Sequence, residues 1–202
     1  MRRLDLSSNS ITGKGARYLE TLLSRCFPVL EYIDLSLNGL DSNSIDKVAK
    51  ALRNARCLEF FDISGGPSCI PVDEASHIAS IPGVEYGASN YAGLAGGLAI
   101  AQMLENMPNM KHVAIRHAGL SNTSFEPIAK SLQSCLNLEY IDVSGNNIEA
   151  FGGMCLSKVP TACPKLRYID ASHNPLTDRG VAALAHALQR SQSLESLHLG
   201  NV

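Results

Sequence analysis

The sequence predicts an α/β solenoid, a curved stack in which short parallel strands line the inner face and helices line the outer face. The first observation is a nine-residue phrase that has apolar first, fourth and sixth positions and ends in Asn, as in residues 30–38 and 166–174. The second is a run with helical apolar spacing that follows the phrase. A recurring unit of this kind buries its apolar side on its neighbours, which produces a solenoid.

The last position of the phrase marks the successive repeats. It falls at Asn9, Asn38, Gly66, Ala92, Ala118, Asn146, Asn174 and Val202. These positions lie 29, 28, 26, 26, 28, 28 and 28 residues apart. We therefore predict one domain over residues 1–202, with seven whole repeats and a partial eighth, and an irregular repeat at 64–94.

Apolar spacing predicts one strand and one helix in each repeat. Alternation with polar neighbours predicts strands at three pairs, Ile33 and Leu35, Ile141 and Val143, and Leu197 and Leu199. Spacing of i, i+3, i+4 and i+7 predicts helices at Ile45, Val48, Ala49 and Leu52, at Phe125, Ile128, Ala129 and Leu132, and at Val181, Leu184, Ala185 and Leu188. Helices are wider than strands, so the stack curves toward its strands.

Residues 64–94 depart from this pattern. Gly65, Gly66 and Pro67 delay the expected helix, and the next strand position, 84–89, is poor in apolar residues. A helix is expected to follow Gly93. Either this is a degenerate repeat held in place by its neighbours, or it is a loop shaped to contact a partner. Its glycines match no phosphate-binding motif.

The phrase L-x-x-L-x-L-x-x-N resembles that of leucine-rich repeats, and the period of about 28 residues is similar to the ribonuclease-inhibitor-like subfamily. The resemblance covers nearly the whole chain. It implies a leucine-rich-repeat solenoid shaped as a right-handed β/α horseshoe, with parallel strands on the concave face and helices on the convex face. It also implies a ladder of buried amides at Asn9, Asn38, Asn146 and Asn174. Gly66, Ala92 and Ala118 lack the amide, so the bend there needs another support.

Strand residues between the buried ones face the concavity and form two columns. The first contains Arg3, Tyr32, Phe60, Tyr86, His112, Tyr140, Tyr168 and Ser196, and the second Asp5, Asp34, Asp62, Ala88, Ala114, Asp142, Asp170 and His198. Tyrosine suits protein recognition, and the carboxylates favour a basic partner. The predicted contacts to a protein ligand are Tyr32, Asp34, Phe60, Asp62, Tyr86, His112, Arg116, Tyr140, Asp142, Tyr168 and Asp170. The alternative is that Asp and Ser here only form hydrogen bonds within the ladder.

Composition and motifs favour a non-enzymatic protein-protein interaction module or scaffold. The net charge of −2 and the pI near 6.3 argue against nucleic-acid binding. No apolar run approaches the length of about 18 residues that a membrane span needs. Carboxylates on an open face exclude no water, and His112 and His198 lie too far apart to share a metal ion. We therefore expect no catalytic site, metal or cofactor.

The six cysteines are Cys26, Cys57, Cys69, Cys135, Cys155 and Cys163. Four of them, Cys26, Cys57, Cys135 and Cys163, lie within four residues before the first apolar residue of a strand. Because the position recurs, we expect buried free thiols at helix ends, and hence a cytoplasmic, reducing location.

The two ends of the sequence and the resemblance leave further alternatives. Met1 already occupies a core position and Val202 lies within a repeat, so we expect a fragment of a longer protein or end-to-end self-association through uncapped repeats. The subfamily includes activators of the small GTPase Ran, which makes a GTPase regulator an alternative. Residues 174–180 are also similar to repeats of innate-immune sensors and of actin regulators such as the CARMIL and tropomodulin families.

Overall fold

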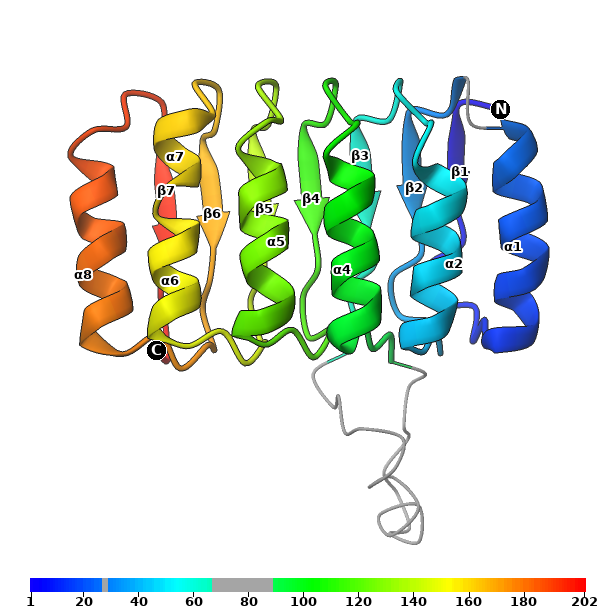
Figure 1. Cartoon of the computed structure of the whole chain (residues 1–202), viewed down its shortest axis with the longest axis horizontal. Helices are drawn as coiled ribbons and strands as arrows, with labels where there is room; N and C mark the ends of the chain where they lie inside the picture. The colour runs from blue at the N-terminus through cyan, green and yellow to red at the C-terminus, as the bar shows by residue number, and fades with distance from the viewer. Residues whose placement is uncertain (27–28, 67–88) are drawn as a thin grey trace, which may run out of the picture.

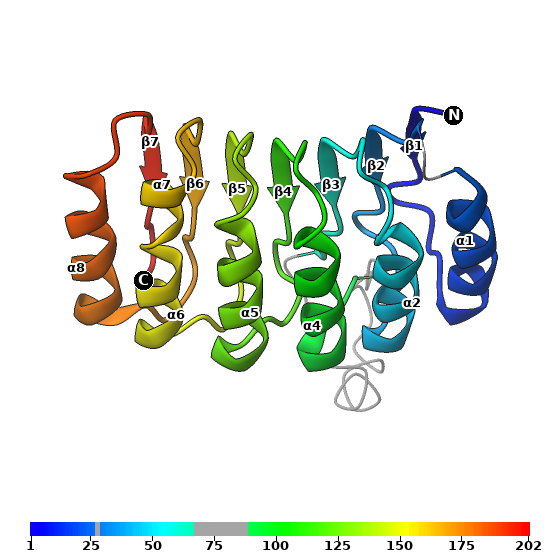
Figure 2. The ribbon, with the colours of Figure 1, turned by 45° about the horizontal axis from the view of Figure 1, so that its top comes forward.

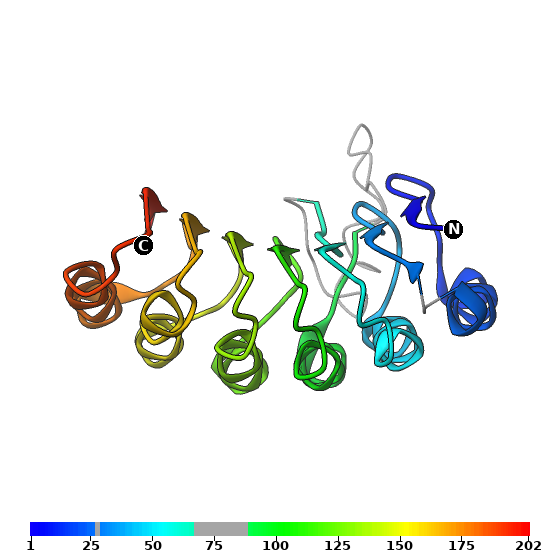
Figure 3. The same ribbon diagram turned by 90° about the horizontal axis from the view of Figure 1, so that it is seen from above.

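The computed structural model, which describes residues 1–26, 29–66 and 89–202, is a curved two-layer stack (Figure 1). In these ranges seven strands form one parallel sheet in chain order. The strands are β1 (Arg3–Asp5), β2 (Tyr32–Asp34), β3 (Phe60–Asp62), β4 (His112–Ala114), β5 (Tyr140–Asp142), β6 (Tyr168–Asp170) and β7 (Ser196–His198). Figure 3 shows the strands along the inside of the arc and the helices along its outside, which confirms the predicted horseshoe.

The helices stand side by side on the convex side of the sheet (Figure 2). They are α1 (Gly13–Cys26), α2 (Ser42–Leu52), α4 (Gly93–Leu104), α5 (Asn122–Leu132), α6 (Ala150–Leu156), α7 (Val159–Ala162) and α8 (Thr177–Leu188). The predicted stripes of α2 and α5 are buried, with Ile45 and Phe125 fully inaccessible to solvent. In α8, Ala185 and Leu188 are exposed, because no further helix packs beyond α8. The core therefore lies between one sheet and one row of helices.

The strand predicted at 84–89 lies almost entirely outside the described residues. β4 pairs directly with β3, with Phe60 opposite His112 and Asp62 opposite Ala114. In the described ladder β4 thus follows β3 directly, whereas the sequence prediction placed a further strand and two 26-residue repeats in this interval. Residues 67–88, which contain most of the irregular segment, lie outside the described residues.

Asn90 restores the repeat after this segment. Its side-chain amide is buried and donates to the carbonyl oxygens of Leu35 at 2.7 Å and Ile63 at 3.2 Å. Its Oδ1 accepts from the backbone N–H of Leu40 at 3.1 Å. In the preceding repeat Asn38 does the same, donating to the carbonyls of Leu6 and Leu35. Asn90, and not Gly66, therefore holds the bend of the third repeat.

The period becomes regular once Asn90 is the marker. Gly66 lies 28 residues after Asn38, and Ala118 lies 28 residues after Asn90. The sequence between Gly66 and Asn90 therefore interrupts a single repeat. Ala118 lacks the amide, and there the backbone compensates, because the carbonyl oxygen of Ala118 accepts from the N–H of Ala92 at 2.8 Å.

The helix layer is also continuous across the interruption. α4 packs between α2 and α5, and two glycines allow the close approach. A Cβ on Gly96 would lie 3.0 Å from Ile45 Cγ2, and one on Gly97 would lie 2.7 Å from Ser124 Cβ. Both contacts are tighter than ordinary van der Waals packing. The sheet and the helix layer are thus both continuous across the interruption.

The cysteines follow the sequence prediction only in part. Cys135 and Cys163 are buried free thiols, and burial raises the pKa of the Cys135 thiol to about 12. Cys57 is exposed, which contradicts the prediction, because Ala55 occupies the corresponding buried position of its repeat. Cys69 and the side chain of Cys26 lie outside the described residues. None of the described helices combines the length and hydrophobicity that crossing a membrane requires.

Candidate functional site

The first concave column forms a continuous stack of rings, which we call the aromatic ladder. Its members are Tyr32, Phe60, His112, Tyr140, Tyr168 and His198. Ring centroids lie 4.1 Å apart for Tyr32 and Phe60 and 4.5 Å apart for Tyr140 and Tyr168, with interplanar angles of 13° and 1°. The stack exists because the parallel strands pair in register, which places one ring of each strand beside the next.

The structure changes the membership of this column at two places and keeps the predicted Arg3 at one end. His112 stacks directly on Phe60 at 4.2 Å, where the sequence prediction inserted Tyr86, a residue outside the described ranges. At one end the guanidinium carbon of Arg3 lies 3.5 Å from the centroid of the Tyr32 ring. At the other end His198, assigned to the second column, leans onto Tyr168 with a centroid distance of 5.0 Å.

Stacking determines which part of each ring can meet a ligand. Each inner ring has neighbours on both faces, so its edge and any hydroxyl group remain toward the concavity. His112 is part of this apolar stack, and its burial together with the nearby Arg116 cation lowers its pKa from 6.5 to about 4. It is therefore a neutral aromatic ring at physiological pH.

The second column carries five carboxylates, which we call the acidic column. They belong to Asp5, Asp34, Asp62, Asp142 and Asp170. In each, Oδ1 accepts from the backbone N–H of the serine two residues later, as Asp142 does from Ser144 at 3.0 Å. The alternative that these aspartates only form hydrogen bonds within the ladder therefore holds for one oxygen of each. The other oxygen lies toward the tyrosines: the Tyr140 hydroxyl donates to Asp142 Oδ2 at 3.3 Å.

Arg116 fills the gap in the acidic column. Ala114 stands between Asp62 and Asp142 in the ladder, and the guanidinium of Arg116 contacts the carboxylates of both. Its Nη2 is 3.7 Å from Asp62 Oδ2, and its Nε is 3.6 Å from Asp142 Oδ2 and 3.3 Å from Ser64 Oγ. Burial raises the pKa of the Asp62 carboxyl despite its bonds to Ser64. The chain thus supplies its own cation at the centre of the face.

A row of charges that the sequence reading missed borders the face where the strands begin. It consists of Arg2, Glu31, Glu59, Lys111, Glu139, Arg167 and Glu195. Lys111 Nζ binds Glu59 at 2.8 Å, and Arg167 binds both carboxylate oxygens of Glu195 at 2.7 and 3.0 Å. The signal was available, because a charged residue recurs just before each first-column position.

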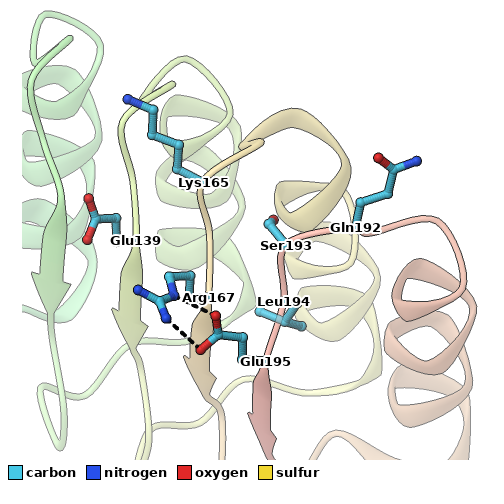
Figure 4. A pocket seen from close by; sticks show the side chains of 7 residues that line it. All are labelled: Glu139, Lys165, Arg167, Gln192, Ser193, Leu194 and Glu195. Carbon is cyan, nitrogen blue, oxygen red and sulfur yellow. Dashed lines mark hydrogen bonds and ion pairs between the residues drawn. The ribbon is translucent and has the colours of Figure 1, made fainter.

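Figure 4 shows the hollow at one end of this row, of about 440 Å³ and lined by Glu139, Lys165, Arg167, Gln192, Ser193, Leu194 and Glu195. Arg167 and Glu195 lie side by side across it and neutralise one another. Lys165 Nζ donates to Asn137 Oδ1 at 2.7 Å. The hollow is open and its charges are largely matched. Over the described residues, no three His, Cys, Asp or Glu side chains are grouped as a metal site requires.

Comparisons with known proteins agree with this geometry. A family model described as Leucine Rich repeat matches residues 1–19, 134–157 and 162–185. Tonsoku-like protein of Danio rerio is 30% identical over 136 residues, which cover 65% of this chain and 8% of that protein. The chain therefore corresponds to a small part of that relative.

Two solved structures share the fold at low sequence identity. The tropomodulin C-terminal domain of Caenorhabditis elegans superimposes with a TM-score of 0.57 at 10% identity, covering 87% of this chain and 92% of that one. Actin-binding site 2 of leiomodin-1 superimposes with a TM-score of 0.55 at 12% identity, covering 86% and 87%. With its repeated phrase, its strand-and-helix stack and its amide ladder, this chain is a leucine-rich-repeat protein.

Proposed function

We propose that this chain is a non-enzymatic interaction module that binds a protein ligand along its concave strand face. The observation that carries the proposal is that alternate residues of each strand have different roles. Ile33, Ile141 and Ile169 are fully buried and hold the core, whereas their neighbours in the strands form the aromatic ladder and the acidic column. The concave side chains thus form a continuous surface beside the buried core.

The size and chemistry of this surface favour a protein as the ligand. Seven parallel strands at about 4.8 Å spacing give a face roughly 29 Å long, which matches a polypeptide segment and exceeds a small molecule. Tyrosine provides a large contact area with a polar tip and is common among residues that dominate interface energies. The free thiols are consistent with the cytoplasmic location that we also propose.

Partner capture tests the proposal with tyrosines as matched probes. One bait is the unaltered chain, a second carries Tyr140→Ala and Tyr168→Ala in the ladder, and a third carries Tyr18→Ala. Tyr18 is 79% exposed on α1, on the convex side, and serves as the control. We expect a protein from a cytosolic extract that the first and third baits retain and the second loses. Circular dichroism checks that all three baits are folded.

Equal retention by all three baits would contradict a concave site, and loss with Tyr18→Ala alone would move the site to the helices. Because a solved structure with this fold is named as an actin-binding site, purified actin is an additional arm of the same experiment. Cosedimentation that depends on the ladder tyrosines would identify actin as the ligand.

A further inference from the structure

We propose that the concave face selects an extended polypeptide segment with two basic side chains about six residues apart, one bound at Asp34 and one at Asp170, and uncharged residues between them. This inference rests on the proposed function and names the chemistry of its ligand. Three observations lead to it: which carboxylates have a cation, where Arg116 lies, and how far apart the remaining carboxylates are.

The carboxylates of the acidic column differ in whether the chain supplies a cation for them. Asp5 has Arg3 at 4.0 Å, and Asp62 and Asp142 share Arg116. Within the described residues, Asp34 and Asp170 have no such cation. In each, Oδ1 is held by a serine, at 2.7 Å from Ser36 Oγ for Asp34 and at 2.6 Å from Ser172 Oγ for Asp170. Their Oδ2 atoms are therefore the places where a ligand cation adds charge compensation that the fold lacks.

Arg116 makes the centre of the face different from its two sides. Its side chain is 46% exposed, and the two carboxylates lie 3.6 and 3.7 Å away, so some of its N–H groups remain for other acceptors. A ligand lysine at the centre would meet this guanidinium and lose part of the attraction of Asp62 and Asp142. A neutral segment can pass there and accept a hydrogen bond from Arg116 through a backbone carbonyl. The centre therefore disfavours a cation relative to the two flanks.

The sheet geometry sets the distance between the two open carboxylates. Asp34 ends β2 and Asp170 ends β6, and the ladder order places four strand intervals between them. At about 4.8 Å per interval this is about 19 Å, and an extended chain advances about 3.3 Å per residue. A segment that crosses the strands therefore spans the two sites with about six residues. The tyrosines Tyr32 and Tyr168 precede each site by two positions and provide edges for the lysine or arginine stems.

Two labelled peptides of identical composition test the spacing. The outer peptide is Lys-Ser-Thr-Gln-Thr-Ser-Lys, and the inner peptide is Ser-Thr-Lys-Gln-Lys-Thr-Ser. Fluorescence anisotropy measures the binding of each to the whole chain. We expect the outer peptide to bind several-fold more tightly. Asp34→Asn and Asp170→Asn should each weaken the outer peptide about threefold to fivefold, as expected for one partly exposed ion pair, and should change the inner peptide less.

Asparagine is chosen because its side-chain oxygen can still accept from the serine, so the local turn is kept. Glu126→Gln is the matched control, because it removes the same charge from an exposed position on α5. Arg116→Gln supplies the opposite test. Without the central cation, Asp62 and Asp142 become available, and the inner peptide should gain about fivefold more affinity than the outer peptide. Thermal unfolding checks that each variant is folded.

Equal affinity of the unaltered chain for both peptides, or an effect of Asp34→Asn no larger than that of Glu126→Gln, would mean unspecific charge attraction and would overturn this inference. Absence of binding by both peptides would overturn it as well. The proposed function then still stands if the ladder tyrosines govern partner capture. If the ladder tyrosines do not govern capture, the proposed function fails whatever the peptides show.

Discussion

The third and fifth repeats of the sheet each have a buried amide at the bend, but the two amides lie at different distances along the sequence from their strands. In the fifth repeat Asn146 follows its strand directly and donates to Val143 three residues before it at 2.8 Å. In the third repeat Asn90 donates to Ile63, which lies 27 residues before it. Both amides are buried beneath the bend, and both also bond to the preceding repeat.

This difference shows which property the fold requires. The backbone groups at each bend are buried, and an unpaired buried carbonyl or N–H is costly. The repeat therefore needs an amide at one place in space, and the chain can supply it after a long interruption. The interruption is tolerated because the helix and strand on its far side resume the same 28-residue period. Insertions at a bend cost little when both ends return to the ladder.

The largest expected effect tests whether the two amides are equivalent. Asn90→Ala leaves the N–H of Leu40 and the carbonyl of Leu35 without this partner, and Asn146→Ala does the same to Leu120 and Ile115. We expect each variant to lower the free energy of unfolding by about 3 kcal/mol, as for buried polar groups that lose their hydrogen bonds. Urea denaturation of the two variants measures this loss.

The exposed Asn54 provides the control, since Asn54→Ala should change the stability by less than about 0.5 kcal/mol. A loss at Asn90 as small as that at Asn54 would contradict the assignment of Asn90 to the bend. A loss at Asn90 clearly smaller than at Asn146 would show that the interrupted repeat relaxes around the missing amide.

A second, smaller effect concerns the ring at the centre of the ladder. His112 lies between Phe60 and Tyr140 of the flanking strands, and its pKa is lowered from 6.5 to about 4, so the folded state disfavours its protonation. The unfolded chain takes up this proton first. The stability of the folded state should therefore fall as the pH drops from 6.5 to about 4. We expect about 1–2 kcal/mol from this residue after allowance for its partial exposure.

His112→Phe is the matched variant, because phenylalanine keeps the stack between Phe60 and Tyr140 and cannot titrate. Urea denaturation at about pH 7.5 and about pH 4.5 should show a larger loss for the unaltered chain than for the variant. His117 and the carboxylates titrate in both proteins, so the difference isolates His112. Identical pH dependence of the two proteins would show that His112 is not desolvated in the stack.

The sequence predicted the layers of this fold well and its irregular repeat poorly. Apolar periodicity is a local signal, so it located the strands at Tyr32, Tyr140 and Tyr168 and the helices that follow them. The interrupted repeat depends on a contact between Asn90 and strands far away in sequence, which periodicity does not report. The spacing of 28 residues from Asn90 to Ala118 was the available signal, but two spacings of 26 also fitted the interval from Gly66 to Ala118.

The candidate face was predicted in composition and not in geometry. Alternation along the strands placed Tyr140 and Asp142 on the concave side. It did not predict that the rings stack face to face, or that one oxygen of each aspartate is taken by a serine. These features depend on the register between repeats and on side-chain rotamers. The position of Arg116 between Asp62 and Asp142 is of the same kind, because it depends on three adjacent repeats at once.

The smallest expected effect compares two ion pairs of the charged row, one across the interruption and one in the regular part. Lys111 binds Glu59, which lies 52 residues away in sequence, and Arg167 binds Glu195, which lies 28 residues away. All four side chains are well exposed, so each pair should contribute little to stability and lose most of that contribution at about 1 M salt. Lys111→Gln and Arg167→Gln, measured by urea denaturation at low and high salt, should therefore behave alike. A clearly larger loss for Lys111→Gln would mean that this pair helps to hold the two sides of the interruption together, and that the ladder there is less self-sufficient than its hydrogen bonds indicate.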